Sequence, residues 1–129
     1  MRVFKTKWFG RFSRRAGISD ADLCAAIVRA ERGSIDSDLG GGVIKQRIAR
    51  RNQGKSGGFR TIVFFRSGEK SFFVYGFAKS ERGNIAADEL RAFRMLAGEM
   101  FAYDDATLAK ALMSGAIAEV NRDDQEVSE

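Results

Sequence analysis

Residues 43–79 read VIKQRIARRNQGKSGGFRTIVFFRSGEKSFFVYGFAK, and this stretch gives the clearest indication of the fold. Three runs rich in β-branched and aromatic residues predict strands at Val43–Ala49, Phe59–Arg66 and Ser71–Lys79. The separators at 50–58 and 67–70 are too short for a crossover helix. The three strands are therefore expected to form an antiparallel meander.

Alternation along these strands assigns their side chains to the two faces of a sheet. In the middle strand, one face is expected to carry Arg60, Ile62, Phe64 and Arg66, and the other Phe59, Thr61, Val63 and Phe65. In the last strand, Phe73, Tyr75, Phe77 and Lys79 are expected to share a face. Because apolar residues occur on both faces, helices should cover at least one side of the sheet.

The residues before the meander predict one strand and one helix. Alternation predicts a first strand at Val3–Phe9. Ser19 and Asp22 have the spacing of a capping box and precede a helix predicted at Asp20–Arg32. Residues 33–42 are rich in glycine, serine and aspartate, which is typical of a loop.

The residues after the meander predict two helices. The first begins at residue 85 or 86, with Asn84 as its N-cap, and ends near Ala102. The second follows a cap at residue 104 or 105 and ends near Gly115. The chain is thus expected to be an α+β protein with one domain over residues 1–119 and an acidic, frayed tail at 120–129.

Charge is distributed unevenly along the chain. The whole sequence carries a net +5, but residues 41–82 hold ten basic and two acidic residues, whereas residues 83–129 hold four basic and ten acidic ones. A basic centre favours a polyanionic partner, because cations that neutralise phosphates release condensed counterions. The alternative is a solvated cationic face of an ordinary domain.

Composition excludes several classes of protein. There is no histidine and only one cysteine, Cys24, so Ser-His-Asp and Cys-His catalysis, an internal disulfide and a zinc cluster are all excluded. No apolar run reaches the length of a membrane span, and charges interrupt the hydrophobic residues of the N-terminus. We therefore expect a cytoplasmic protein.

Four strings identify a resemblance: DLGGGVIKQRIAR, GKSGGFR, FFVYGFAKSERGNI and LAKALMSGAIAEV. They resemble the RelE/HigB-like superfamily of type II toxins, over roughly Asp20–Val120. The resemblance implies a RelE/ParE-like fold whose antiparallel sheet becomes mixed at the N-terminal strand. It also implies an endoribonuclease that cuts messenger RNA, typically on the ribosome, and a cognate antitoxin, expected to be a helix-turn-helix protein. No cofactor and no metal are expected.

The resemblance also assigns roles to residues of this chain. The family's phosphate-contacting arginine, at the start of the middle strand, matches Arg60. The family's tyrosine near the start of the last helix has no counterpart at residues 84–86. The catalytic candidates are Arg60, Lys79, Arg82 and Lys55. The RNA-binding candidates are Lys45, Arg47, Arg50, Arg51 and Ser56.

Cleavage of RNA through its own 2′-hydroxyl needs a base, a stabiliser of the charged phosphorane and an acid. Arg60 and Arg82 are expected on the phosphate, because arginine does not deprotonate in proteins. Lys79 or Lys55 is expected to transfer protons, with Glu81 as a weaker candidate base.

Two other functions fit the same residues: a nucleic-acid-binding or regulatory module that does not cut, and an interaction protein whose basic face docks an acidic partner. Tyr75 is expected to be a core residue, because Phe73 and Phe77 beside it are apolar. With few aromatic residues expected at the surface, phosphate contacts should dominate RNA binding and sequence preference should be weak.

Overall fold

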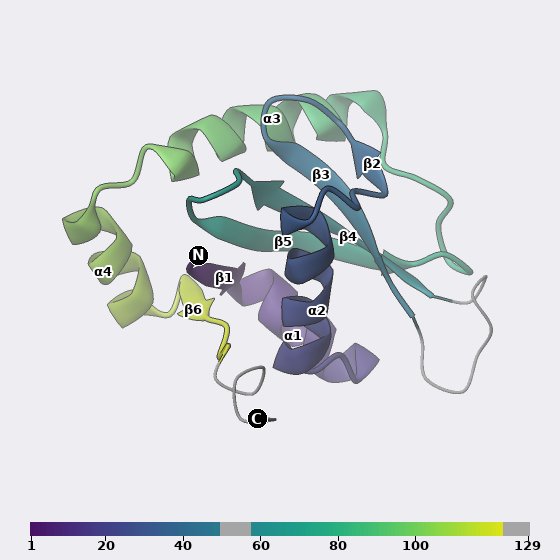
Figure 1. Cartoon of the computed structure of the whole chain (residues 1–129), viewed down its shortest axis with the longest axis horizontal. Coiled ribbons are helices and arrows are strands. Elements are labelled where there is room, and N and C mark those ends of the chain that lie inside the picture. Colours follow the sequence, from purple (N-terminus) through teal and green to yellow (C-terminus); the bar gives the residue numbers. More distant parts are fainter. Residues whose placement is uncertain (50–57, 123–129) are drawn as a thin grey trace.

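The structure, a computed structural model, describes residues 1–49 and 58–122. In chain order its elements are β1 (Val3–Thr6), α1 (Lys7–Ala16), α2 (Asp20–Glu31), β2 (Ser37–Asp38), β3 (Val43–Ile48), β4 (Phe59–Phe65), β5 (Ser71–Ala78), α3 (Ala87–Phe101), α4 (Asp105–Ser114) and β6 (Ile117–Glu119). The strands form one six-stranded sheet in the order β2-β3-β4-β5-β1-β6 (Figure 1).

The sheet confirms the α+β class and the antiparallel meander. β3 pairs antiparallel with β4, and β4 pairs antiparallel with β5. β1 lies parallel beside β5, which makes the sheet mixed at the N-terminal strand, and β6 is antiparallel to β1. The first strand is thus placed inside the sheet, where both of its edges are paired.

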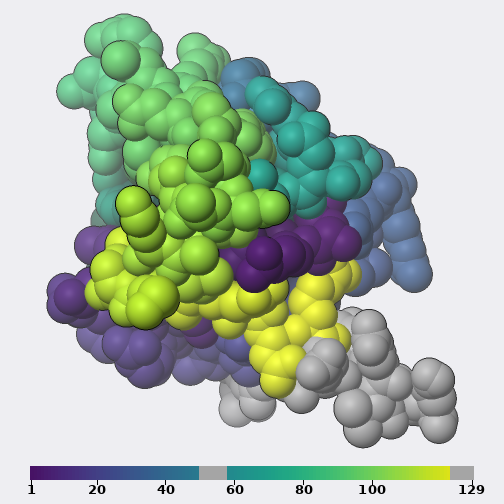
Figure 2. Space-filling model, turned by 90° about the vertical axis from the view of Figure 1, so that its left-hand side faces the viewer, coloured from purple at the N-terminus to yellow at the C-terminus, as the bar shows by residue number. Residues whose placement is uncertain are grey.

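Helices cover both faces of the sheet. On one face, α1 and α2 pack through residues such as Phe9, Leu23 and Ile27 against Val63 and Phe73. On the other face, side chains of α3 and α4 complete a second buried cluster. Figure 2 shows this end of the molecule, where α4 lies beside the N-terminal residues and the C-terminal strand.

A β-bulge changes the expected alternation of the third meander strand. The register shifts between Ile62 and Val63, so that Ile62 pairs with Tyr75 while Val63 pairs with Phe73. Phe73 therefore belongs to the buried cluster under α1 and α2, whereas Tyr75 packs against the cluster on the α3 side. The prediction that Phe73 and Tyr75 share a face is wrong, because the extra residue of the bulge reverses the alternation.

The predicted strand Val3–Phe9 is also wrong in its second half. β1 ends at Thr6, whose hydroxyl accepts a hydrogen bond from the Phe9 N–H at 3.2 Å and so caps α1. The helix ends at Gly17, which has a φ of 72°. The sequence contained the signals of this helix: a threonine cap, apolar residues spaced three and four apart and a closing glycine. The short alternating run before them favoured a strand instead.

Other boundaries differ from expectation less strongly. The N-cap of α3 is Ala86, whereas the Asn84 carboxamide oxygen accepts from the Ile85 N–H at 2.9 Å. The strands β2 and β6 were not predicted. The packed region continues past residue 119, because Val120 is 2% exposed and donates its N–H to the Val3 carbonyl at 2.8 Å.

The other caps were predicted correctly. Ser19 and Asp22 form the capping box of α2, and Asp104 caps α4 by accepting from the Thr107 N–H at 2.8 Å. Within the described parts of the chain, none of the helices combines the length and the apolar character needed to cross a membrane.

A buried glutamine ties α2 and the loop after it to the sheet. Gln46 on β3 is fully buried and donates to the carbonyls of Ala26 and Ser34 at 3.1 and 3.2 Å. Its carbonyl oxygen accepts from the Asp36 N–H at 2.8 Å. Since every polar atom of the side chain is paired, the residue is satisfied in the core and fixes which face of β3 lies under α2.

We expect Gln46→Leu to destabilise the protein by about 1–3 kcal/mol, because the Asp36 N–H and two carbonyls lose their partner. Urea unfolding measures this change. Thr61→Val serves as the control. Thr61 is equally buried, but its hydroxyl makes one bond, to the backbone carbonyl of Gln46, and the change leaves no donor unpaired. Equal losses in the two variants would contradict the role given to Gln46.

Candidate functional site

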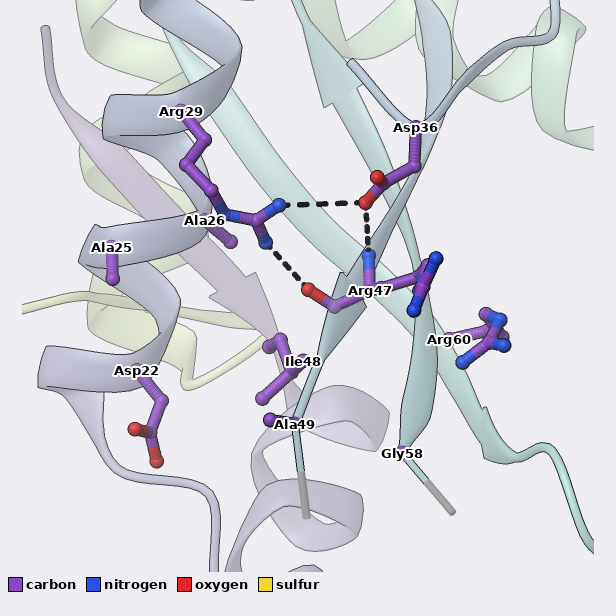
Figure 3. Close-up of a pocket in the computed structure, with 10 residues that line it drawn as sticks. All are labelled: Asp22, Ala25, Ala26, Arg29, Asp36, Arg47, Ile48, Ala49, Gly58 and Arg60. Atoms are coloured by element: carbon purple, nitrogen blue, oxygen red, sulfur yellow. Dashed lines mark hydrogen bonds and ion pairs between the residues drawn. The ribbon is translucent and has the colours of Figure 1, made fainter. Parts of the chain in front are cut away.

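The register of β3, β4 and β5 brings basic residues together on the α3 side of the sheet. Arg47 lies directly opposite Arg60, and Arg60 lies opposite Phe77. The next row holds Lys45, Ile62 and Tyr75. Figure 3 shows the Arg47 and Arg60 side chains on the side of the strands away from α2. We call Arg47, Arg60 and Phe77 the cationic row.

Arg60 is a nearly buried cation without an acidic partner in the described residues. It is 9% exposed, and the hydrogen bond that its side chain makes within the described part of the chain is long, 3.5 Å, to the carbonyl of Phe59. Burial, and then the charge of Arg47, lower the pKa of the Arg60 guanidinium below its ordinary value, while Asp36 acts in the opposite sense. Like charges directly opposite each other on a sheet destabilise the fold, and a bound anion would relieve this repulsion.

The carboxylate nearest the row is engaged elsewhere. Asp36 accepts from the backbone N–H of Arg47 at 2.7 Å and forms an ion pair with Arg29 at 3.5 Å (Figure 3). Arg29 in turn donates to the Arg47 carbonyl. β2 pairs with β3 only as far as Lys45. At Arg47 the side chains of Asp36 and Arg29 bond the backbone N–H and carbonyl of β3 in place of a neighbouring strand.

A cleft of about 640 Å³ opens around this end of β3. It is lined by Asp22, Ala25, Ala26, Arg29, Asp36, Arg47, Ile48, Ala49, Gly58 and Arg60 (Figure 3). Its basic wall is formed by the two arginines of the cationic row together with Arg29. The cleft therefore offers space for an anion beside Arg60.

Arg82 is held by neighbouring groups. Its guanidinium donates to the Tyr75 hydroxyl at 2.9 Å, to the Asn84 carbonyl at 2.7 Å and to both carboxylate oxygens of Glu89. The hydrogen bond with Glu89 is the main cause that raises the pKa of Arg82, and the same bond lowers the pKa of Glu89. In this arrangement the Glu89 carboxylate already neutralises the positive charge of Arg82.

Tyr75 reaches the start of α3 through Arg82. Sequence reasoning placed it in the core and found no tyrosine near the start of this helix. The structure shows a half-buried Tyr75 whose hydroxyl oxygen accepts from Arg82, and Arg82 bonds Glu89 in the first turn of α3. The tyrosine comes from β5, the element before α3, so the local pattern at 84–86 could not reveal it.

The remaining candidates lie around the cationic row. The Lys45 ammonium donates to the Asn84 carboxamide oxygen at 3.2 Å. Lys79, which is exposed and follows the end of β5, donates its backbone N–H to the Gly58 carbonyl at 3.2 Å, so it lies two residues beyond Phe77, the partner of Arg60. Glu81 is exposed. Four further candidates lie outside the described residues: Arg50, Arg51, Lys55 and Ser56.

Sequence reasoning missed an aromatic cleft at the edge of β5. Trp8 on α1 is 43% exposed and stacks on Tyr75, with ring centroids 4.7 Å apart, and on Phe12 at 5.6 Å. Phe12 fits because Gly76 has no side chain: a Cβ there would lie 2.4 Å from the Phe12 ring. Trp8, Phe12 and Ala16 are spaced four residues apart, and this helical spacing was the signal in the sequence that indicated a shared face.

This aromatic cleft has a volume of about 600 Å³. It is lined by Trp8, Phe12, Arg15, Ala16, Phe59, Tyr75, Gly76, Phe77, Ala78, Glu81 and Arg82. Phe77 lines this cleft and is paired with Arg60 in the sheet, so the cleft and the cationic row adjoin at this residue. Among residues 1–49 and 58–122, no group of three or more acidic or cysteine side chains is arranged to hold a metal ion.

Comparison with known proteins gives one family. The family described as "RelE toxin of RelE / RelB toxin-antitoxin system" matches residues 1–120, which is nearly the whole chain. No curated protein matches the sequence.

The contact between Glu89 and Arg82 predicts a pH dependence of stability. Because the pKa of Glu89 is lowered in the folded protein, its ionised form stabilises the fold above the ordinary pKa of about 4.3, and this stabilisation is lost as the pH falls through the folded value. We expect Glu89→Gln to lower the thermal midpoint at pH 7, and the difference from the wild type to shrink below about pH 4.

The control for this prediction is Glu99→Gln, which removes an exposed carboxylate from the same helix. Thermal unfolding of both variants across the pH range decides the outcome. A Glu89→Gln deficit that stays constant down to acid pH would show that the carboxylate charge does not stabilise α3.

Proposed function

Since this chain belongs to the RelE toxin family of RelE/RelB toxin-antitoxin systems, we propose that it is an endoribonuclease that cuts messenger RNA in association with the ribosome. The observation that carries the proposal is the cationic row. It holds a nearly buried arginine, opposite a second arginine, without a carboxylate partner among the described residues. A phosphate diester of RNA has the charge and the oxygen acceptors that such a pair lacks.

In the proposed reaction, the RNA 2′-hydroxyl attacks the adjacent phosphorus and the 5′-oxygen leaves. Arg60 and Arg47 bind the non-bridging oxygens and stabilise the charge that develops on the phosphorane. Because Arg60 is desolvated, its attraction for this charge is stronger than that of an exposed arginine. The substrate needs no further nucleophile from the protein.

Proton transfer falls to a group beside the row. Tyr75 accepts a hydrogen bond from Arg82 through its oxygen and so retains its own O–H for donation to the leaving oxygen. Lys79, two residues beyond Phe77, and Glu81 remain candidates for the base, as does Lys55 outside the described residues. Arg82, which is neutralised by Glu89, is proposed to hold Tyr75 in place.

The proposed partners follow from the family. A RelE/RelB system implies a cognate RelB antitoxin, and we propose that this antitoxin is encoded beside the toxin and carries a helix-turn-helix. Messenger RNA and the ribosome are the proposed targets of the free toxin.

We expect Arg60→Ala to relieve the growth arrest caused by expression of the chain in bacteria. Loss of one such donor typically costs about 100- to 1000-fold in rate, and Arg60 lies at the margin of the core, so the fold should survive. Lys110→Ala removes one exposed cation from α4 and should remain toxic. An Arg60→Ala protein as toxic as the parent at equal expression would refute the site. Binding of the parent to ribosomes that carry messenger RNA, without cleavage of that RNA, would favour a non-catalytic module.

We also expect RNA binding by the isolated protein to weaken strongly with salt. If about four to six phosphates are engaged, the slope of log K against log salt is about −3 to −4 for single-stranded RNA. Arg47→Ala should reduce the magnitude of this slope by less than about one unit. A slope near zero would indicate that the basic centre binds an acidic protein instead.

A further inference from the structure

The geometry points to a nucleobase-binding subsite in the aromatic cleft between α1 and β5, which would hold one unstacked base of a single-stranded RNA. The inference rests on the proposed function, since it takes the RNA backbone to lie on the cationic row. It adds a contact to the base, which the basic centre alone does not supply.

The lining of the cleft has the character of a ligand site. Five aromatic residues line it, Trp8, Phe12, Phe59, Tyr75 and Phe77, and the polar side chains Arg15, Glu81 and Arg82 also line the cleft. A volume of about 600 Å³ lies within the usual range of small-molecule sites, about 300–1,000 Å³. Such a mixture of flat apolar surface and a few polar groups suits a base, which has an apolar face and a polar edge.

The packing of the core does not account for the exposed position of Trp8. Its neighbour Phe9 is fully buried, whereas Trp8 remains 43% exposed although it contacts both Tyr75 and Phe12. The described residues contain three other large hydrophobic side chains with comparable or greater exposure, Met95, Leu96 and Met113, and these lie on α3 and α4. Trp8 is thus the exposed aromatic residue beside the basic centre.

The aromatic cleft adjoins the cationic row, and this position indicates that its ligand is a base of the bound RNA. Phe77 lies opposite Arg60 in the pairing of β4 with β5, and it also lines the aromatic cleft. Arg82 bridges the same two regions, because its guanidinium lies 5.7 Å from the Phe77 ring centroid and donates to Tyr75. A phosphate at Arg60 would therefore place the adjoining nucleotide beside this cleft, where its base can contact the aromatic side chains.

The test compares two hexamers with the same non-cleavable 2′-O-methyl backbone, one carrying adenine at every position and one without bases. Since a stacked base typically strengthens binding by about 5- to 150-fold, the wild type should bind the adenine hexamer tighter by a factor in this range. In Trp8→Ala this ratio should fall towards one while binding of the abasic hexamer is unchanged. Met95→Ala, which truncates an exposed side chain on α3, should behave as the wild type.

Trp8 is the single tryptophan of the chain, so it also reports directly on the unmodified protein. Its fluorescence should change on addition of the adenine hexamer and stay constant with the abasic one, a measurement that does not depend on the folding of a variant. Equal affinity of the wild type for both hexamers, or a ratio unaffected in folded Trp8→Ala, would overturn the subsite while leaving phosphate binding intact. Failure of the wild type to bind either hexamer at low salt would instead refute the RNA-binding function itself.

Discussion

The register between β3 and β4 is the constraint on which the rest of the site depends. A shift of one residue would turn every side chain of β3 to the opposite face, so that Arg47 would point under α2 and Gln46 away from it. Gln46 opposes such a shift because its amide is satisfied by α2 and by the loop that follows. A buried polar residue on one face thus places the cations on the other face.

Ion pairing divides the basic residues into two groups. Arg29 and Arg82 have carboxylate partners, Asp36 and Glu89, and they hold the backbone of β3 and the start of α3 in position. Arg60 has no such partner among the described residues, and burial and the charge of Arg47 lower the pKa of its guanidinium. Arg29 and Arg82 thus build the frame, whereas Arg60, which is nearly buried and has no carboxylate partner among the described residues, has the capacity to bind an anionic ligand.

The edge of β5 adds an apolar surface to this charged one. The bulge beside Val74 turns Tyr75 towards the α3 side, and the bare backbone of Gly76 lets Phe12 of α1 lie against the strand. Both features are local departures from a regular strand, and together they connect the cationic row to the cleft beside Trp8. A chain molecule that alternates phosphates and flat bases matches such a surface better than an acidic protein does.

The sequence by itself determined the meander, the capped helices α2 and α4 and the concentration of positive charge, because these depend on residue order over short distances. It also placed Arg47 and Arg60 on two neighbouring strands of the meander, because the strand pattern is local, and their role in binding RNA stays a prediction. The tertiary structure was needed to show that the helical signals after Thr6 prevail over the alternating run, that the bulge separates Phe73 from Tyr75, and that Glu89 pairs with Arg82. Each of these outcomes depends on contacts between elements, which the residue pattern within one segment does not show: packing of α1 on β5, pairing of β4 with β5, and docking of α3 beside the turn after β5.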